Sequence, residues 1–231
     1  MEPPGSIRDG EASHRQRGCC DVIRIVDYEA GNLTSVRRAL DHLDIRCRIV
    51  SSGEALVAGL SGSADRIIFP GVGHAGAAMR RLRERALDEA LVEAFQRGTP
   101  ILGICLGAQI VLTASEEGDT PCLDLIRGHC PRFELIDPGL KVPHMGWNEV
   151  EVVRPHPVLR DLREGDAFYF VHSYYPLPRQ TTDIFATCEY GAPFPAVIGR
   201  DNLVATQFHP EKSGRVGLSL LRRFAEWDGV V

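Results

Sequence analysis

Hydrophobic and polar positions follow two alternating patterns over the first half of the chain. Short β-branched or apolar runs, which are typical of buried strands, occupy residues 22–26, 45–50, 66–69 and 101–104. Segments with apolar residues at helical spacing lie between them, at residues 33–43, 54–60 and 75–96, and a further one starts near Leu106. Strands that alternate with helices favour an α/β fold with an open, mainly parallel central sheet flanked by helices.

The pattern changes in the second half of the chain. Turn sequences separate six short alternating or β-branched segments, at residues 132–136, 149–153, 167–171, 184–188, 196–198 and 204–208. We expect these segments to add antiparallel strands to the parallel sheet. An amphipathic helix is predicted over residues 215–227. Because no internal repeat or low-complexity linker divides the sequence, we expect one domain over residues 22–231, preceded by a disordered extension over residues 1–21.

Composition and charge narrow the class of protein. The chain has 231 residues with 26 basic and 31 acidic side chains, so its formal net charge is −5. Such a mildly acidic chain with interspersed charges does not favour binding to nucleic acid or to an anionic membrane. The longest apolar run, residues 101–114, is too short to span a bilayer. Residues 1–18 lack the apolar segment of a secretory signal, so a cytoplasmic location is expected.

The strongest local signal is Gly103–Gly107, in which Cys105 stands between two glycines, after an apolar strand and before an apolar helix. This Gly-x-Cys-x-Gly pattern is the thiol counterpart of the nucleophile elbow. The glycines allow a tight turn that projects the thiol above the sheet edge, and the positive end of the following helix favours the thiolate. The pentapeptide alone leaves open a buried cysteine in an ordinary strand–helix turn.

A nucleophilic cysteine needs a base, and His209-Pro210-Glu211 offers one together with a group that orients it. Pro210 favours an extended conformation for His209, and residues two apart in an extended chain point to the same side. Glu211 can therefore orient one imidazole nitrogen while the other faces the thiol, as in a Cys-His-Glu triad. Taken alone, the tripeptide is more typical of a surface turn.

A third candidate element, Pro70–Gly73, directly follows the strand predicted over residues 66–69. The glycines on either side of Val72 let successive backbone N–H groups turn inward as an anion-binding nest, which beside a nucleophile acts as an oxyanion hole. By itself this turn is equally compatible with a phosphate or with no ligand. It lacks the lysine of a P-loop and the three-glycine spacing of a dinucleotide site, which disfavours nucleotide binding.

These elements occur in the order found in class I (triad) glutamine amidotransferases, and the sequence resembles that family from residue 22 to about residue 227. Within the family it is similar to the glutaminase subunits of imidazole glycerol phosphate synthase. This narrower resemblance rests on four strings, Asp27–Val36 (DYxAGNLxSV), Lys141–Asn148 (KVPHMGWN), Phe168–Tyr175 (FYFVHSYY) and Gln207–Ser213 (QFHPEKS). In the first string x marks positions outside the match, and Glu29 stands where a small residue is usual.

The resemblance implies a role for each matching residue. Cys105 would be the nucleophile, His209 the general base and then acid, and Glu211 the group that orients it. The backbone of Gly71, Val72, Gly73 and Leu106 would form the oxyanion hole. The glutamine site would comprise Gly73, Gln109, Glu117, Ser173 and Tyr174. The face that docks on a partner subunit would contain Asn32, Trp147 and Lys212.

The resemblance also implies the reaction and the partner. Glutamine would be hydrolysed to glutamate and ammonia without a metal or organic cofactor, and the ammonia would pass to a (βα)₈-barrel cyclase subunit of a heterodimer. That cyclase makes imidazole glycerol phosphate and an aminoimidazole carboxamide ribotide in histidine biosynthesis. Three alternatives are disfavoured. The string Lys141–Asn148 argues against the glutaminase of anthranilate or aminodeoxychorismate synthase, and the complete triad argues against a non-catalytic allosteric scaffold. Gln109 and Glu117, which suit a free amino acid, argue against a cysteine peptidase.

A few positions depart from the family pattern or receive structural roles. His74 follows Gly73, so the usual aromatic residue after this motif is absent. Cys122, His129 and Cys130 lack a fourth ligand at suitable spacing, and no metal site is predicted. Other histidines are expected to be structural: His144 and His172 through hydrogen bonds, and His156 in a solvated turn between two prolines.

Overall fold

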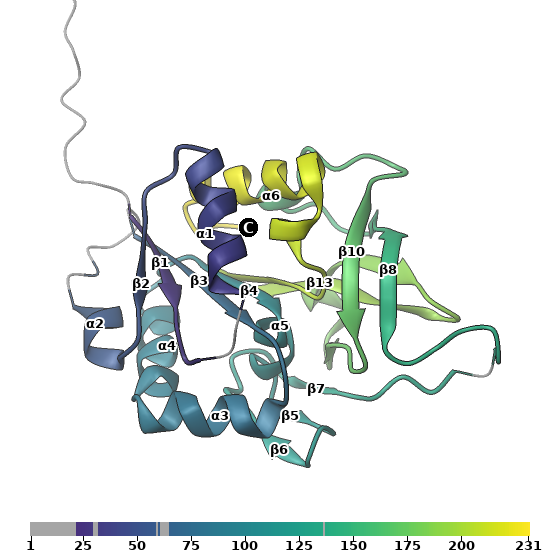
Figure 1. Cartoon of the computed structure of the whole chain (residues 1–231), viewed down its shortest axis with the longest axis horizontal. Helices are drawn as coiled ribbons and strands as arrows, with labels where there is room; N and C mark the ends of the chain where they lie inside the picture. The colour runs from purple at the N-terminus through teal and green to yellow at the C-terminus, as the bar shows by residue number, and fades with distance from the viewer. Residues whose placement is uncertain (1–21, 30–31, 59, 61–64, 136) are drawn as a thin grey trace, which may run out of the picture.

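A mixed eight-stranded sheet forms the centre of the protein (Figure 1). The computed structural model describes residues 22–29, 32–58, 60, 65–135 and 137–231, so the extension expected over residues 1–21 lies outside the described residues. The order of the strands in the sheet is β2-β1-β3-β4-β14-β13-β12-β9. Their bounds, in that order, are Cys47–Val50, Ile23–Val26, Arg66–Gly71, Ile101–Cys105, Leu203–Thr206, Pro193–Arg200, Ile184–Glu189 and Glu151–Val152.

The predicted parallel half of the sheet is confirmed. Strands β2, β1, β3, β4 and β14 pair parallel to one another. Every residue of β1, β3 and β4 is buried, as expected for parallel strands covered on both faces. The remaining pairs, from β14 through β13 and β12 to β9, are antiparallel. Strand β14 was expected among the antiparallel additions, but it pairs parallel with β4 and so joins the two halves of the sheet.

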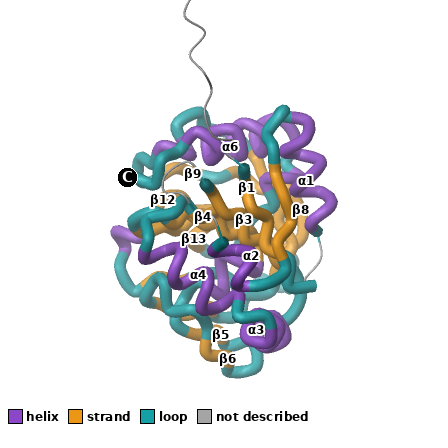
Figure 2. The backbone as a smooth tube through the Cα atoms, turned by 90° about the vertical axis from the view of Figure 1, so that its left-hand side faces the viewer, coloured by secondary structure: helices purple, strands orange, loops and turns teal. Residues whose placement is uncertain are grey.

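Helices cover both faces of this sheet. Helices α1 (Leu33–His42) and α6 (Gly214–Glu226) lie on one face (Figure 1). On the other face lie α2 (Gly53–Val57), α3 (Ala75–Glu84), α4 (Leu87–Gln96) and α5 (Leu106–Ile110). Figure 2 shows the strands enclosed between these two groups of helices. Each face buries its own hydrophobic cluster, so the α/β layering places an apolar core on both sides of the strands.

The single long helix expected over residues 75–96 is instead two helices. Ala86, between α3 and α4, adopts a left-handed conformation with φ of 53°. The carbonyl oxygen of Arg85 accepts a hydrogen bond from the N–H of Gly53 at 2.8 Å. A Cβ atom at Gly53 would lie 2.1 Å from the carbonyl oxygen of Ala86, so α2 begins in direct contact with the break. Since the local sequence has no glycine or proline, this tertiary contact was not predictable from the helical pattern.

The second half contains two smaller sheets beside the central one. Strands β8 (His144–Glu149) and β10 (Ala167–His172) form an antiparallel pair, on the right of Figure 1. A four-stranded sheet comprises β11 (Leu177–Pro178), β7 (Gly128–Cys130), β5 (Ala114–Ser115) and β6 (Thr120–Pro121). Short 3₁₀ turns occupy Pro157–Leu159, Thr181–Asp183 and Pro210–Lys212.

Two of the predicted strands in this half need correction. Residues 132–135 form no strand but a single bridge between Arg132 and Tyr174, and residue 136 lies outside the described residues. The strand expected over residues 149–153 is divided between the end of β8 and the short β9. The other predicted strands are present with shifts of a few residues at their ends. Within the described residues, no helix has the length and apolar character needed to cross a membrane.

His156 is buried rather than solvated. Only 3% of its surface is exposed, its Nδ1 accepts the N–H of Val158 at 3.1 Å, and its ring packs on Phe185 and Trp227. Burial, with a smaller effect of Arg154, lowers the pKa of His156 to about 4. The pKa of a histidine in the unfolded chain is about 6.5. Between about pH 4 and pH 6.5 the side chain is therefore mostly protonated in the unfolded chain and mostly neutral in the folded protein.

This difference in proton binding predicts acid sensitivity. The contribution of His156 to stability is present above pH 6.5 and is lost as the pH falls towards 4, with a slope of up to about 1.4 kcal/mol per pH unit. His156→Asn keeps an acceptor for the N–H of Val158 but does not ionise. We expect urea unfolding of this variant to depend less steeply on pH in that range than unfolding of the wild type. Equal pH slopes for the two proteins would contradict this expectation.

Candidate active site

Cys105 lies at the junction of β4 and α5 with the strained backbone of a nucleophile elbow. Its φ of 54° and ψ of −106° are unusual for a residue with a side chain. A Cβ atom at Gly103 would lie 2.9 Å from that of Ala205, and one at Gly107 would lie 2.1 Å from the carbonyl oxygen of Phe69. Both glycines of the motif are therefore required by close approach of neighbouring strands.

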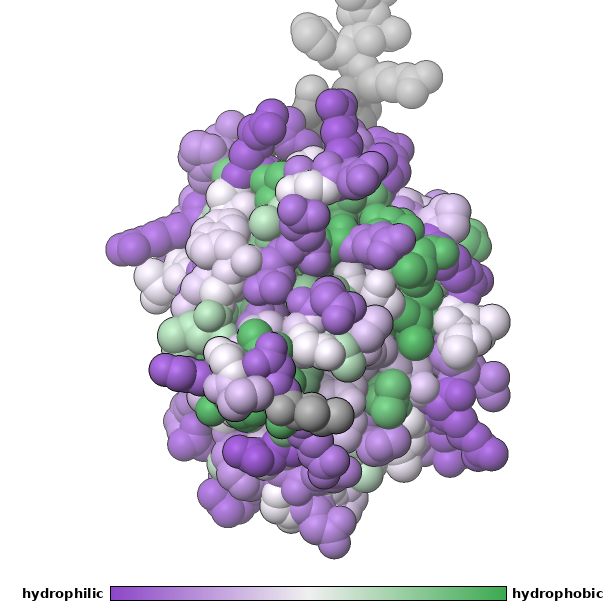
Figure 3. All heavy atoms as spheres, turned by 90° about the vertical axis from the view of Figure 1, so that its right-hand side faces the viewer, coloured by the Kyte–Doolittle hydropathy of each residue, from purple (hydrophilic) through white to green (hydrophobic). Residues whose placement is uncertain are grey.

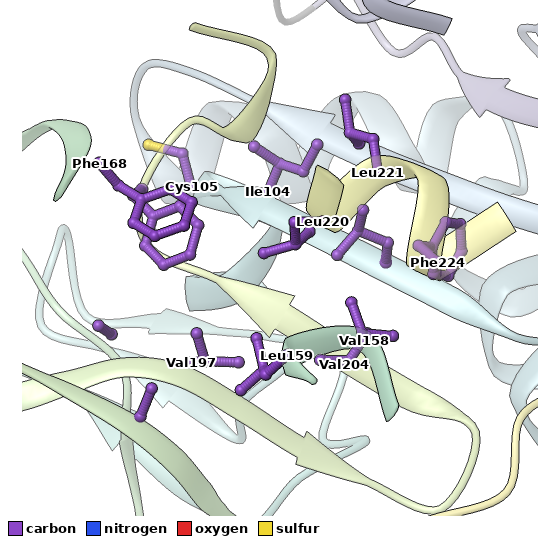
Figure 4. Close-up of a cluster of buried hydrophobic side chains, with 14 of the residues drawn as sticks. Ile104, Cys105, Val158, Leu159, Phe168, Val197, Val204, Leu220, Leu221 and Phe224 are labelled. Atoms are coloured by element: carbon purple, nitrogen blue, oxygen red, sulfur yellow. The ribbon is translucent and has the colours of Figure 1, made fainter. Parts of the chain in front are cut away.

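The thiol stands at one end of a hydrophobic cluster. Figure 4 shows Cys105 beside Phe168, with Ile104, Leu220 and Leu221 continuing the cluster towards α6. Only 6% of the cysteine surface is exposed. The packed side chains fix the position of the elbow, while the residue still lines a surface pocket.

His209 and Glu211 form a buried pair next to the nucleophile. Nδ1 of His209 donates to Oε1 of Glu211 at 2.8 Å, and the two side chains are 1% and 0% exposed. His209 is extended, as predicted, and its N–H donates to the carbonyl of Tyr169 at 3.0 Å. Glu211 lies in the 3₁₀ turn that follows, so the extended spacing predicted for this pair is wrong although the two side chains do meet. Burial disfavours the imidazolium, but the Cys105 sulfur and the Glu211 carboxylate outweigh it and raise the pKa of His209 to about 10.

The Nε2 nitrogen of His209 is available for proton transfer. Among the described residues, its Nε2 atom is buried without a hydrogen-bond partner. Because Nδ1 is held by Glu211, Nε2 is the atom that can exchange a proton with the sulfur or with a substrate.

The Pro70–Gly73 segment lies directly beside the nucleophile. In the parallel pairing of β3 with β4, Gly71 is the register partner of Cys105. A Cβ atom at Gly71 would lie 1.9 Å from the hydroxyl of Tyr28, so no side chain fits there. Gly73 has a φ of 98° with nothing packed where a Cβ would stand, and Val72 is 38% exposed. The segment is thus close to the thiol and lightly packed at its outer end.

A pocket of about 270 Å³ opens over the thiol. Its lining includes Cys105, the oxyanion-hole candidates Val72, Gly73 and Leu106, and the remaining residues expected to bind glutamine, namely Gln109, Glu117, Ser173 and Tyr174. The structure therefore brings together around one pocket residues that lie as far apart in the sequence as Val72 and Tyr174. The size suits a small polar metabolite rather than a peptide chain.

Two of these residues also bind other parts of the protein. Oε2 of Glu117 accepts the N–H of Ala75 at 2.7 Å, at the beginning of α3. Nε2 of Gln109 donates to the carbonyl of Tyr174 at 2.9 Å and to Oε1 of Gln207 at 3.0 Å. Gln109 and Glu117 thus fix the shape of the pocket as well as lining it.

Two residues at the site were given no catalytic or substrate-binding role from the sequence. Gln207 is fully buried and contacts the sulfur of Cys105, and His172 lines the pocket. The structural role expected for His172 is confirmed, because Nε2 lies 3.1 Å from Nδ1 of His144 and Nδ1 donates to Tyr174 at 2.7 Å. In the sequence, Gln207 stands two residues before His209, which places it near the site. What its side chain faces is decided by the fold, since residues 207 and 208 form a bend rather than an extended segment.

The residues expected to contact a partner do not all have the same environment. Trp147 on β8 is 58% exposed and packs beside Tyr169, and the ammonium of Lys212 lies 5.9 Å from the same ring. Figure 3 shows hydrophobic residues among hydrophilic ones on the side of β8 and β10. Asn32 is turned inward instead, since its Nδ2 donates to Oε1 of Glu211. Asn32 therefore links the start of α1 to the His–Glu pair.

Comparison with known proteins identifies the family. The class-I glutamine amidotransferase family model matches residues 24–226. The imidazole glycerol phosphate synthase subunit HisH of Nitratidesulfovibrio vulgaris is 49% identical over 88% of this chain and 95% of that protein. The HisH subunit of Desulfovibrio desulfuricans is 48% identical over 89% and 94%, respectively. A solved glutamine amidotransferase shares the fold with a TM-score of 0.66 at 22% identity, covering 90% of this chain and 99% of that chain. The chain belongs to the class I glutamine amidotransferase family.

Proposed function

We propose that this protein is the glutaminase subunit of an imidazole glycerol phosphate synthase. It hydrolyses glutamine to glutamate and ammonia and supplies the ammonia to a cyclase subunit in histidine biosynthesis. The observation that carries the proposal is the pocket over Cys105, lined by the glutamine-binding candidates, beside the buried His209–Glu211 pair. The choice of this synthase is supported by the HisH relatives, which are identical to this chain at about half of the aligned positions.

In the first half of the reaction, the Cys105 thiolate attacks the side-chain amide carbon of glutamine. The carbonyl oxygen becomes an oxyanion, which backbone N–H groups of the Gly71–Gly73 segment and of Leu106 stabilise. Nε2 of His209 gives its proton to the amide nitrogen, the carbon–nitrogen bond breaks, and ammonia leaves. A γ-glutamyl thioester on Cys105 remains.

The second half returns the enzyme to its starting state. His209, now neutral, removes a proton from water, and the resulting hydroxide attacks the thioester carbon. The carbon–sulfur bond breaks, glutamate leaves, and the Cys105 thiolate with a protonated His209 is restored. Glu211 accepts the hydrogen bond from Nδ1 and holds the imidazole in the orientation that each transfer needs.

The partner face is assigned to the surface around Tyr169, Trp147 and Lys212. An exposed tryptophan and a cation that share one aromatic ring provide the apolar and charged contacts typical of an interface centre. Asn32 would connect this face to the triad through Glu211. We propose a heterodimer with a cyclase subunit, acting in the reducing cytoplasm where the Cys105 thiol stays free.

Reconstitution tests this function. The purified chain is mixed with the cyclase subunit of the same organism, and glutamate release is measured with and without the cyclase's ribotide substrate. We expect glutamine to support formation of imidazole glycerol phosphate, at a rate that ammonium salts match without this chain. If the chain instead supports anthranilate formation with an anthranilate synthase component, and not the cyclase reaction, the assignment is wrong.

The triad makes a ranked prediction. His209→Ala removes the proton carrier, whereas Glu211→Gln removes the charge that orients it but keeps the side-chain shape. We expect the loss of the single-turnover rate of glutamine hydrolysis to be smaller for Glu211→Gln than for His209→Ala. Rates are compared in the complex at saturating glutamine. Equal or reversed losses would show that Glu211 has a different role.

A further inference from the structure

Gln207 occupies a position between the nucleophile and the glutamine pocket. It follows β14 directly, is fully buried, and its N–H donates to the carbonyl of Ala196 at 2.8 Å. Its side-chain Nε2 lies 3.6 Å from the sulfur of Cys105, within hydrogen-bond range for sulfur. Its Oε1 accepts from Nε2 of Gln109 at 3.0 Å. The reaction steps given above do not use this side chain.

The direction of these hydrogen bonds is fixed by one backbone oxygen. The carbonyl of Tyr174 can only accept, so the atom of Gln109 that lies 2.9 Å from it is the amide nitrogen. That same nitrogen faces Gln207, which must therefore present its oxygen to Gln109. The amide nitrogen of Gln207 is then left facing the sulfur. Rotating either amide would place two donors, or two acceptors, against each other in a buried site.

His172 further restricts the chain of hydrogen bonds. Its Nδ1 donates to the same carbonyl of Tyr174 at 2.7 Å, so this oxygen receives two donors and both of its lone pairs are in use. A hydrogen-bonded path thus runs from His172 and Gln109, which line the pocket, through Gln207 to Cys105. The direction of each hydrogen bond between Tyr174 and Gln207 is therefore fixed.

A donor of fixed direction makes the sulfur an acceptor. A thiolate accepts hydrogen bonds more strongly than a thiol does, so a buried N–H group aimed at the sulfur stabilises the charged form. We propose that Gln207 is a further catalytic residue of this enzyme, whose side-chain N–H donates to Cys105 Sγ, stabilises the thiolate and aims it at the glutamine pocket. The inference rests on the proposed glutaminase function.

Two variants test the donor and a third controls for loss of packing. Gln207→Met keeps the volume but offers the sulfur no donor, and Gln207→Glu keeps an acceptor for Gln109 while replacing the NH₂ group by oxygen. The control is Asn202→Leu, which removes another buried amide at the opposite end of β14, where Nδ2 donates to the carbonyl of Thr99 at 2.6 Å. Asn202 does not line the pocket.

The readout is the pH dependence of Cys105 alkylation by iodoacetamide in the complex with the cyclase, followed by mass spectrometry of the Cys105 peptide. A hydrogen bond to a charged group is strong enough to change an ionisation equilibrium about tenfold or more. We expect the midpoint of the alkylation profile to rise by about one pH unit or more in Gln207→Met and further in Gln207→Glu. For Gln207→Met, kcat for glutamine should fall about tenfold at neutral pH with a smaller change in KM.

The controls separate this inference from the function itself. Asn202→Leu should keep the wild-type alkylation midpoint, and ammonia-dependent synthesis should be unchanged in all three variants. A wild-type midpoint in both Gln207 variants, or an equal shift in Asn202→Leu, would overturn the role of Gln207 while leaving the glutaminase assignment intact. A wild-type complex that releases no glutamate would overturn the function instead, whatever the alkylation profiles show.

Discussion

We expect Cys105→Ala to abolish glutamine-dependent synthesis by the proposed complex with the cyclase, while ammonia-dependent synthesis continues at the wild-type rate. The expected loss of glutamine hydrolysis is roughly 10⁴–10⁶-fold, as for other enzymes that lose a covalent nucleophile. The fold and the partner surface should remain intact. The substitution removes only the sulfur atom from a side chain at the end of the hydrophobic cluster.

The matched control for this prediction is Cys122→Ala. Cys122 is a half-buried thiol whose pKa is raised by burial to about 11, and it does not line the pocket over Cys105. Its replacement should leave glutamate release unchanged. Glutamine turnover within tenfold of the wild type in Cys105→Ala, measured on both variants in the same assay, would show that another residue is the nucleophile.

The second large effect concerns the partner. The isolated chain should release glutamate slowly, and binding of the cyclase with its ribotide should accelerate it by about 10²–10³-fold, the usual effect of one oxyanion-hole donor. The physical reason lies in residues 71–73, where Gly73 has a positive φ and open space around it and Val72 is exposed. If a carbonyl of this segment faces Cys105 at rest, the oxyanion lacks one donor. A partner that binds the rotated form more tightly shifts the population towards it.

A surface variant checks this coupling. Trp147→Ala should weaken activation of glutamate release more than it weakens ammonia-dependent synthesis, since Trp147 is exposed on β8 beside Tyr169. The control is Ile49→Ala, at a 43% exposed apolar residue on the edge strand β2. This explanation of activation by the partner is wrong if the isolated wild-type chain already releases glutamate at the rate of the fully liganded complex. The triad assignment is unaffected by that result.

The hydrophobic pattern predicts the layered fold well where local periodicity and tertiary structure agree. The fully buried strands β1, β3 and β4 and the amphipathic helices α1 and α6 follow directly from it. The pattern fails where a distant contact decides the backbone. The break at Ala86 depends on the amide of Gly53, and the parallel pairing of β14 depends on its position beside β4. Neither contact leaves a trace in the local sequence.

The candidate site shows the same division. Sequence motifs point to Cys105, His209 and Glu211. The glycines on either side of Cys105 are needed because neighbouring backbone approaches closely, and His209 and Glu211 stand two residues apart and form a hydrogen bond. Gln207 and the inward position of Asn32 are different, since each role depends on which side chain the fold places opposite. Which end of a buried amide donates and which accepts is decided by its neighbours in the fold, so the sequence alone does not reveal the hydrogen bonds of Gln207 and Asn32.

Trapping the covalent intermediate tests the central claim, that Cys105 forms a γ-glutamyl thioester. The complex is mixed with radiolabelled glutamine, quenched in acid within one turnover, and analysed by mass spectrometry of the peptide that contains Cys105. The account predicts a labelled γ-glutamyl group on Cys105 in the wild type and none in Cys105→Ala. In Glu211→Gln the amount of label is larger if hydrolysis of the thioester is slowed more than its formation. Label on another residue, or glutamate formed by Cys105→Ala at an undiminished rate, would contradict it.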